Sequence, residues 1–168
     1  FDLAVVGPAE PGRTATEEAI AEGVLFGAGR PVIVVPFIQN PGLDLEHVMV
    51  CWDGGEAAAR AIGDSMPLLK KAKQVEVVIV GNEPGKKDEI PGADLGKHLA
   101  RHGLKVDVKR LTAPDLDVTN TLLSYAADSG ATFMVMGGYG HSRLREFVLG
   151  GATRGMLSSM TVPTLMSH

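Results

Sequence analysis

A glycine-rich stretch near the carboxyl end of the sequence has the residue types and spacing of an anion-binding site. Gly137 ends an apolar run, Gly140 follows after two residues, and nine further residues lead to Gly150 and Gly151. If a helix starts there, Thr153 falls in its first turn. The unpaired N–H groups and partial positive charge of a helix N-terminus attract anions, and glycines leave these groups open to approach. The stretch therefore predicts either a phosphate-binding loop or a set of ordinary turns, and the residues by themselves leave both open.

Other kinds of chemistry find little support in the sequence. The glycine spacing is neither the dinucleotide-binding G-x-G-x-x-G nor a P-loop, because no Gly-Lys-Ser/Thr follows. No Ser-His-Asp arrangement, paired-carboxylate motif or metal-ligand cluster is recognisable, so we expect no catalytic residues and no metal site. His98 and His102 are four residues apart on an expected helix, but without an apparent third ligand a solvated helix face is favoured over a zinc site.

Alternating apolar runs and helical patterns supply the elements that must position the glycines. Strands are expected over residues 3–6, 32–35, 48–52, 75–80, 106–111, 133–136 and 162–166. Helices are expected over residues 16–26, 55–72, 93–102, 118–128 and 152–160. Strands that alternate with helices require right-handed crossovers and a parallel sheet, so the predicted fold class is α/β.

Composition and charge exclude several classes of partner. The 168 residues are 45% hydrophobic and 21% charged, with a net charge of -4. No run of Lys or Arg exceeds a pair, so we expect no nucleic-acid partner. No apolar stretch approaches the roughly 20 residues that span a bilayer, so we expect no membrane. Cys51 is the single cysteine, which favours a reducing, cytoplasmic compartment and a thiol that packs as a small apolar group.

The two ends of the chain resemble each other. FDLAVVG at residues 1–7 resembles TFMVMGG at 132–138, and RPVIVVP at 30–36 resembles TVPTLMS at 161–167. We therefore expect an incomplete repeat, unless two short apolar strands recur by chance. The predicted division is a partial unit at 1–38 (strand, helix, strand), a linker at 39–44 and a complete unit at 45–168.

These motifs resemble the signature of the universal stress protein family. MGGYG, nine residues and then GGATRGML resemble the family's G-x2-G-x9-G-(S/T) pattern, and Asp53-Gly54-Gly55-Glu56 resembles its Asp-Gly-Ser-Glu. The resemblance covers residues 45–168, and 1–38 resemble the end of a preceding copy. It implies a tandem-type member with an incomplete first repeat. The implied fold is an adenine-nucleotide alpha-hydrolase-like open parallel five-stranded sheet of order 3-2-1-4-5, flanked by helices, with an extra strand-helix-strand unit at the N-terminus.

The resemblance also implies an ATP site at the carboxyl ends of strands 1 and 4, with Mg²⁺ bound only together with the nucleotide. Asp53 and the backbone near Val80 would face the adenosine part. The loop after the fourth strand would line the ribose and phosphate path, and the start of the last helix would hold the phosphates. The implied binding residues are Asp53, Val80, Met136, Gly137, Gly140, Gly150, Gly151, Ala152 and Thr153.

Two positions depart from the family pattern. Gly151 stands where nucleotide-binding members carry Ser or Thr, and Gly55 replaces a usual serine. A hydrogen bond to a charged group contributes about 1.5–3 kcal/mol, so loss of one hydroxyl would weaken nucleotide affinity by about one to two powers of ten. Thr153, Arg143 and Arg145 are candidates to compensate.

Two functions are compatible with this pattern. The first is a stress-response regulatory module that binds ATP and shows at most weak ATP hydrolysis. The second is an interaction scaffold of the same family that binds no nucleotide. Fifth strands of the family pair in dimers, so we expect a homo-oligomer, and within this chain 32–35 is expected to pair antiparallel with 162–166. The first unit lacks its own strands 1 to 3, so either a second chain covers its apolar faces or part of the protein is missing from the sequence.

Overall fold

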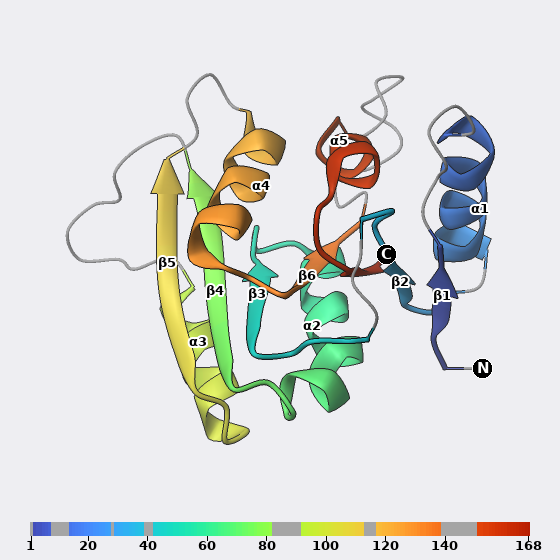
Figure 1. Ribbon diagram of the computed structural model, residues 1–168. Helices are drawn as coiled ribbons and strands as arrows, with labels where there is room; N and C mark the ends of the chain where they lie inside the picture. The colour runs from blue at the N-terminus through green and yellow to red at the C-terminus, as the bar shows by residue number, and fades with distance from the viewer. Residues whose placement is uncertain are drawn as a thin grey trace.

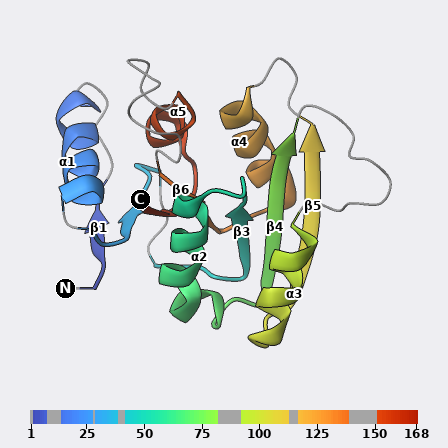
Figure 2. The ribbon, with the colours of Figure 1, turned by 180° about the vertical axis from the view of Figure 1, so that it is seen from behind.

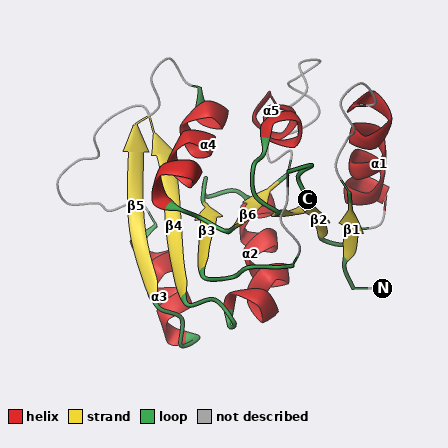
Figure 3. Ribbon diagram, in the orientation of Figure 1, coloured by secondary structure: helices red, strands yellow, loops and turns green. Residues whose placement is uncertain are grey.

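The computed structural model has a single sheet of seven strands with helices on both faces (Figures 1 and 3). It describes residues 2–7, 14–27, 29–38, 42–81, 92–112, 117–138 and 151–168. The strands are β1 (Ala4–Val6), β2 (Val32–Val34), β3 (His47–Cys51), β4 (Gln74–Gly81), β5 (Val106–Thr112), β6 (Phe133–Gly137) and β7 (Thr164–Ser167). The helices are α1 (Thr14–Gly27), α2 (Glu56–Leu69), α3 (Ala93–Arg101), α4 (Val118–Ser129) and α5 (Gly151–Ser159).

The strand order is β1-β2-β7-β6-β3-β4-β5. Every neighbouring pair is parallel except β2 and β7, which are antiparallel, so the sheet is mixed. Residues 45–168 contribute the five mutually parallel strands β5-β4-β3-β6-β7. The five strands expected for the complete unit are therefore part of a larger mixed sheet, because β2 of the expected extra N-terminal unit joins the edge of β7 and brings β1 into the same sheet.

The predicted antiparallel pairing between the N-terminal and C-terminal strands is confirmed. Its register places Ile33 opposite Leu165 and Val34 opposite Thr164. Strand β7 consequently has β6 on one edge and β2 on the other. Because both edges of β7 are occupied within the chain, a dimer formed through the fifth strands of two chains would first have to displace β2.

The helices divide the core into two layers. Helices α2 and α3 cover one face of the sheet, and α1, α4 and α5 cover the other (Figures 1 and 2). Strand β3 is central, and its residues alternate between the layers: Val48 and Val50 pack toward α2 and α3, whereas Met49 packs with α4 and α5. A strand covered on both faces requires an unbroken apolar run, and residues 48–51 supply one.

Local capping residues fix the ends of α4. The Asp117 carboxylate accepts a hydrogen bond from the Asn120 N–H at 3.0 Å, which satisfies one of the unpaired donors of the first turn. Gly130 follows the helix with φ of 70°, a left-handed conformation that favours glycine.

None of the helices among the described residues is long and apolar enough to cross a membrane.

Candidate functional site

The central strands β3 and β6 part at their carboxyl ends. Their pairing stops at Val50 and Val135. Beyond this level β3 stays with β4, since Trp52 N–H donates to the Val78 carbonyl at 2.9 Å. Strand β6 stays with β7 through Gly137. The crossovers from the two strands leave in opposite directions, which is where open α/β sheets place their ligands.

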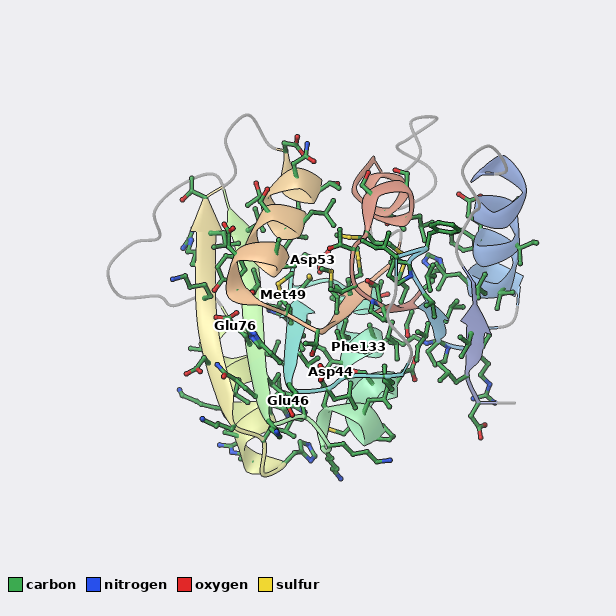
Figure 4. The ribbon with its side chains drawn as sticks, viewed as in Figure 1. Asp44, Glu46, Met49, Asp53, Glu76 and Phe133 are labelled. Carbon is green, nitrogen blue, oxygen red and sulfur yellow. The ribbon has the colours of Figure 1, made fainter. Side chains whose placement is uncertain are left out.

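Asp53 lies at this end of β3, in the turn that leads into α2. Its Oδ1 accepts a hydrogen bond from the Gly55 N–H at 2.8 Å, and Gly54 adopts φ of 80°. The local bond holds the turn, as in other Asx turns. Asp53 nevertheless stays exposed, at the end of β3 opposite to Asp44 and Glu46 (Figure 4). Its implied role toward a ligand stays a prediction.

Gly137 has a packing role that the sequence did not reveal. A Cβ at this position would lie 2.5 Å from the backbone nitrogen of Ala58 and 2.8 Å from the carbonyl carbon of Ala57. Both atoms belong to the first turn of α2. Glycine is therefore required here so that the end of β6 can approach α2, whatever its contribution to a ligand site.

The side chains of Met136 and Val80 point into the protein. Met136 is 6% exposed and belongs to the core layer under α4 and α5. Val80 is half-buried and packs against the same layer, next to Leu111. These two predicted site residues can therefore offer a ligand only their backbone groups.

The structure describes only part of the phosphate-binding end of the predicted site. Helix α5 begins at Gly151, and Ala152 lies in its first turn. Thr153 is 4% exposed, so its hydroxyl lies inside the protein, which makes it a poor substitute for the missing Ser or Thr at the helix start. Gly140, Gly150 and both arginines suggested as compensating charges lie outside the described residues.

Trp52 and Gly92 also lie near the end of β3, and neither was among the predicted site residues. A Cβ on Gly92 would meet the Ile79 Cδ1 at 2.5 Å and the Trp52 Cδ1 at 3.5 Å. The start of α3 therefore packs tightly against the end of β4 and the indole ring. The only tryptophan of the chain, directly before Asp53, was the available sequence signal.

A half-buried polar cluster lies toward the opposite ends of the strands. The Tyr125 hydroxyl donates to Glu76 Oε1 at 2.8 Å, and His47 Nε2 lies 3.4 Å from Glu76 Oε2. His47 Nδ1 is 3.2 Å from the Ser129 carbonyl. Desolvation, followed by the bond to Glu76, raises the pKa of Tyr125 to about 12. These contacts join α4 to β3 and β4, so we interpret the cluster as structural.

A surface hollow of about 610 Å³ lies beside α4 and the end of β5, and one of its lining residues, Leu111, pairs with Val80 of β4. Its lining residues are Leu111, Thr112, Asp117, Asn120, Thr121, Ser124, Tyr125 and Asp128.

Among the described residues, no group of three His, Cys, Asp or Glu side chains is placed to hold a metal ion.

Comparisons with known proteins find similarity in sequence and in fold. No protein-family model matches the chain. Universal stress protein Slr1230 of Synechocystis sp. is 25% identical over 177 residues, an alignment that covers 98% of this chain and 57% of the relative. A crystal structure of a universal stress protein from Archaeoglobus fulgidus matches 99% of this chain and 60% of that one, with a TM-score of 0.70 and 21% identity. The comparisons support the universal stress protein family.

Other universal stress protein structures match a smaller part of the chain. A second one from Archaeoglobus fulgidus is 17% identical, with a TM-score of 0.53, and covers 72% of this chain and 96% of its own. A universal stress protein in complex with cAMP is 14% identical, with a TM-score of 0.51, and covers 73% of this chain and 97% of its own. At 17% and 14% identity, these structures show a similarity of fold alone. The chain spans less than two thirds of the length of the relative from Synechocystis.

Cys51 lies at the same end of the sheet as Asp53 and should be unreactive. Desolvation, helped by the nearby Asp53 charge, raises the pKa of its thiol to about 12. The thiolate is the reactive form, so at pH 8 we expect Cys51 to react with a disulfide reagent roughly 1,000-fold more slowly in the folded protein than in the urea-unfolded chain. Absorbance of the released thiolate measures both rates. Equal rates would show that the site leaves the thiol open to solvent.

Proposed function

We propose that this chain is a regulatory universal stress protein module that binds an adenine nucleotide where β3 and β6 part. One observation carries the proposal: pairing between these strands stops at Val50 and Val135, although both strands continue with their outer neighbours. The solved complex of another universal stress protein with cAMP supports adenine as the base. In this proposal the bound nucleotide changes a surface that other cytoplasmic proteins recognise.

The described residues fit part of a nucleotide. The exposed Asp53 carboxylate can accept hydrogen bonds from the sugar or the base, and the backbone at Gly137 lies across from it on the neighbouring strand. The first backbone N–H groups of α5, from Gly151 onward, have no partner within the helix and suit phosphate. Gly140 and Gly150 complete the proposed site, and Mg²⁺ would enter only with the nucleotide.

The proposal assigns no catalytic residue. The nucleotide-binding groups named here are backbone amides and one carboxylate. Among the described residues, no nucleophile paired with a base lies beside them, and we propose binding with at most weak ATP hydrolysis. The function would then depend on occupancy of the site rather than on turnover.

Gly151→Ser provides the most direct test of nucleotide binding. The serine restores the hydroxyl that the family pattern carries at this position, and one hydrogen bond to a charged phosphate corresponds to about 10- to 100-fold in affinity. We therefore expect Mg-ATP to bind the variant about 10- to 100-fold more tightly than the original chain, as measured by isothermal titration calorimetry on nucleotide-free protein.

Gly63→Ser is the matched control for this titration. Gly63 is exposed on α2, with no atom within 4 Å of an added Cβ, and it lies in a different helix from the proposed phosphate site. The control should bind Mg-ATP like the original chain. Absence of binding up to millimolar Mg-ATP in both the original chain and Gly151→Ser would contradict the proposal. Equal affinity for Mg-GTP would retain the phosphate site but remove the adenine preference.

A scaffold function is the second candidate. The pairing of Ile33 with Leu165 reproduces within one chain the kind of fifth-strand contact that the family resemblance implies between chains. Such a chain could work through assembly alone. A chain that binds no nucleotide yet retains its folded β2–β7 junction would favour this alternative.

A further inference from the structure

Ser167 and His168 hold both backbone groups of Gly138, the residue that follows Gly137 in the glycine motif. The Gly138 N–H donates to the Ser167 carbonyl at 2.8 Å. The Gly138 carbonyl lies 3.0 Å from Nδ1 of the His168 ring. A carbonyl oxygen can only accept a hydrogen bond, so this contact requires the hydrogen on Nδ1 and makes His168 the donor. The glycine is buried, whereas His168 is exposed.

These bonds set the direction of the backbone in the glycine motif. The Met134 N–H donates to β7 through the Pro163 carbonyl, and the Gly138 N–H donates in the same direction. Successive residues of a strand direct their backbone groups to alternate edges. The N–H and C=O of Gly137 therefore point toward β3, beyond the level at which β6 and β3 stop pairing. A change in the orientation of Gly138 would also move these groups, which face the proposed nucleotide site.

Contacts on two other sides hold His168 in place. The Arg60 guanidinium of α2 donates from Nη1 to the His168 backbone oxygen at 3.0 Å and from Nη2 to the Gly29 carbonyl at 2.9 Å. The His168 ring meets the Phe26 ring of α1 edge to face, with 4.7 Å between the ring centroids. This distance is typical of edge-to-face aromatic pairs. The carboxyl end of the chain accordingly lies between α1 and α2 (Figures 1 and 2).

Helix α1 also contacts Gly138 directly. A Cβ added to Gly138 would lie 2.7 Å from the Leu25 Cδ2. Leu25 is 4% exposed and belongs to the core layer under α4 and α5. Two neighbouring residues of α1 therefore pack against the glycine motif, Leu25 directly and Phe26 through the His168 ring.

We propose that His168 is a positioning residue that fixes the backbone of Gly137 and Gly138 and links it to α1, so that the packing of α1 controls affinity at the nucleotide site. The inference rests on the proposed function for its ligand, whereas the contacts that carry it are present without a nucleotide. Such coupling is reciprocal: a nucleotide that binds better when α1 is packed stabilises that packing by the same factor.

Single substitutions separate the contacts of the His168 ring. His168→Ala removes both the hydrogen bond to Gly138 and the contact with Phe26. His168→Asn keeps a side-chain N–H donor near the position of Nδ1 but loses the ring. Phe26→Leu keeps the hydrogen bond and removes the aromatic partner. Ile20→Ala, at a residue of α1 that is 50% exposed, is the control.

Mg-ATP affinity is measured by isothermal titration calorimetry on nucleotide-free protein. One neutral hydrogen bond corresponds to about 3- to 10-fold in affinity, so His168→Ala should weaken binding by at least that factor. His168→Asn and Phe26→Leu lose only the ring contact, so each should weaken binding by about two- to threefold. Ile20→Ala should bind like the original chain. Because His168 is exposed, its variants should keep the urea midpoint of the original chain.

Amide hydrogen exchange of Gly138, measured by NMR, gives a second readout without nucleotide. This N–H is bonded to the Ser167 carbonyl and exchanges only when the backbone opens locally. We expect exchange to be about 3- to 10-fold faster in His168→Ala, slightly faster in Phe26→Leu and close to the original rate in His168→Asn. The Val75 amide, which is bonded to β5 far from this site, is the internal reference and should not change.

Two results would overturn the proposal. One is an unchanged Gly138 exchange rate in His168→Ala, because the ring would then not fix the backbone. The other is faster exchange in His168→Ala with undiminished Mg-ATP affinity, which would leave the ring a structural role alone. Absence of Mg-ATP binding in both the original chain and Gly151→Ser would instead contradict the proposed function. The exchange rates in His168→Ala and Phe26→Leu would then still decide whether the ring links Gly138 to α1.

Discussion

Replacement of Phe133 by alanine is expected to lower the free energy of unfolding by about 3–5 kcal/mol. Phe133 is fully buried and is the largest fully buried side chain among the described residues. It lies opposite Val48 of β3 and belongs to the core layer under α2 and α3. Truncation removes the apolar contacts of the ring and leaves a cavity between the sheet and the helices, which neighbouring residues fill only partly.

Phe37→Ala is the matched control for the truncation. It removes the same side chain at a position that is 62% exposed, so we expect a change within about 0.5 kcal/mol. Urea unfolding followed by circular dichroism measures both variants. If Phe133→Ala cost no more than Phe37→Ala, the placement of Phe133 in the core would be wrong.

Gly137→Ala is expected to lower the free energy of unfolding by about 2–3 kcal/mol. The added methyl group would lie 2.5 Å from the Ala58 nitrogen and 2.8 Å from the Ala57 carbonyl carbon. These are backbone atoms, so no side-chain rotation can relieve the overlap. Either β6 or the first turn of α2 must move, in the region proposed to bind the nucleotide. Urea unfolding measures the loss.

The control for Gly137→Ala is Gly63→Ala. Gly63 lies in the middle of α2, and its position is exposed to solvent. No atom lies within 4 Å of its added Cβ, and alanine favours a helix over glycine, so this variant should gain about 0.5–1 kcal/mol. Loss of nucleotide binding in Gly137→Ala with unchanged stability would instead show that the glycine serves ligand access alone. The two measurements together separate packing from binding.

At least two physical reasons thus explain why glycine occupies positions of this motif. Gly137 is required by packing against backbone atoms, whereas a Cβ on Gly155 would lie 2.9 Å from the Thr119 Cγ2 of α4 and would force that side chain to shift. Gly151 is the first residue of α5. It lies at the helix N-terminus, where the unpaired backbone N–H groups suit an anion. A motif that predicts a phosphate-binding loop therefore also affects how α2, α4 and α5 pack on the sheet.

Much of the secondary structure could be predicted from local patterns. Residues 118–128 were expected as a helix and form Val118–Ser129; residues 106–111 were expected as a strand and form Val106–Thr112. Boundaries were less secure: α1 begins at Thr14, two residues before the predicted start. Helix ends depend on a few weak terminal bonds, whereas the apolar period is set by many residues.

The antiparallel contact between β2 and β7 came from the family resemblance rather than from the residues of either strand. Their apolar residues predict two buried strands but not which edges meet, because strand pairing depends on segments far apart in the chain. The same limit explains the sheet size. A local pattern shows that residues 4–6 form a strand, and only the folded arrangement shows that this strand extends the sheet of the complete unit.

By itself the sequence determined the α/β class and the glycine spacing, because apolar periodicity and turn residues act over a few neighbouring positions. The tertiary structure decided that Gly137 must lack a side chain, that Thr153 is buried and that Val5 is exposed. Each of these outcomes depends on which distant segment lies against the residue. Such contacts are created when the sheet and helices assemble, so no local pattern contains them.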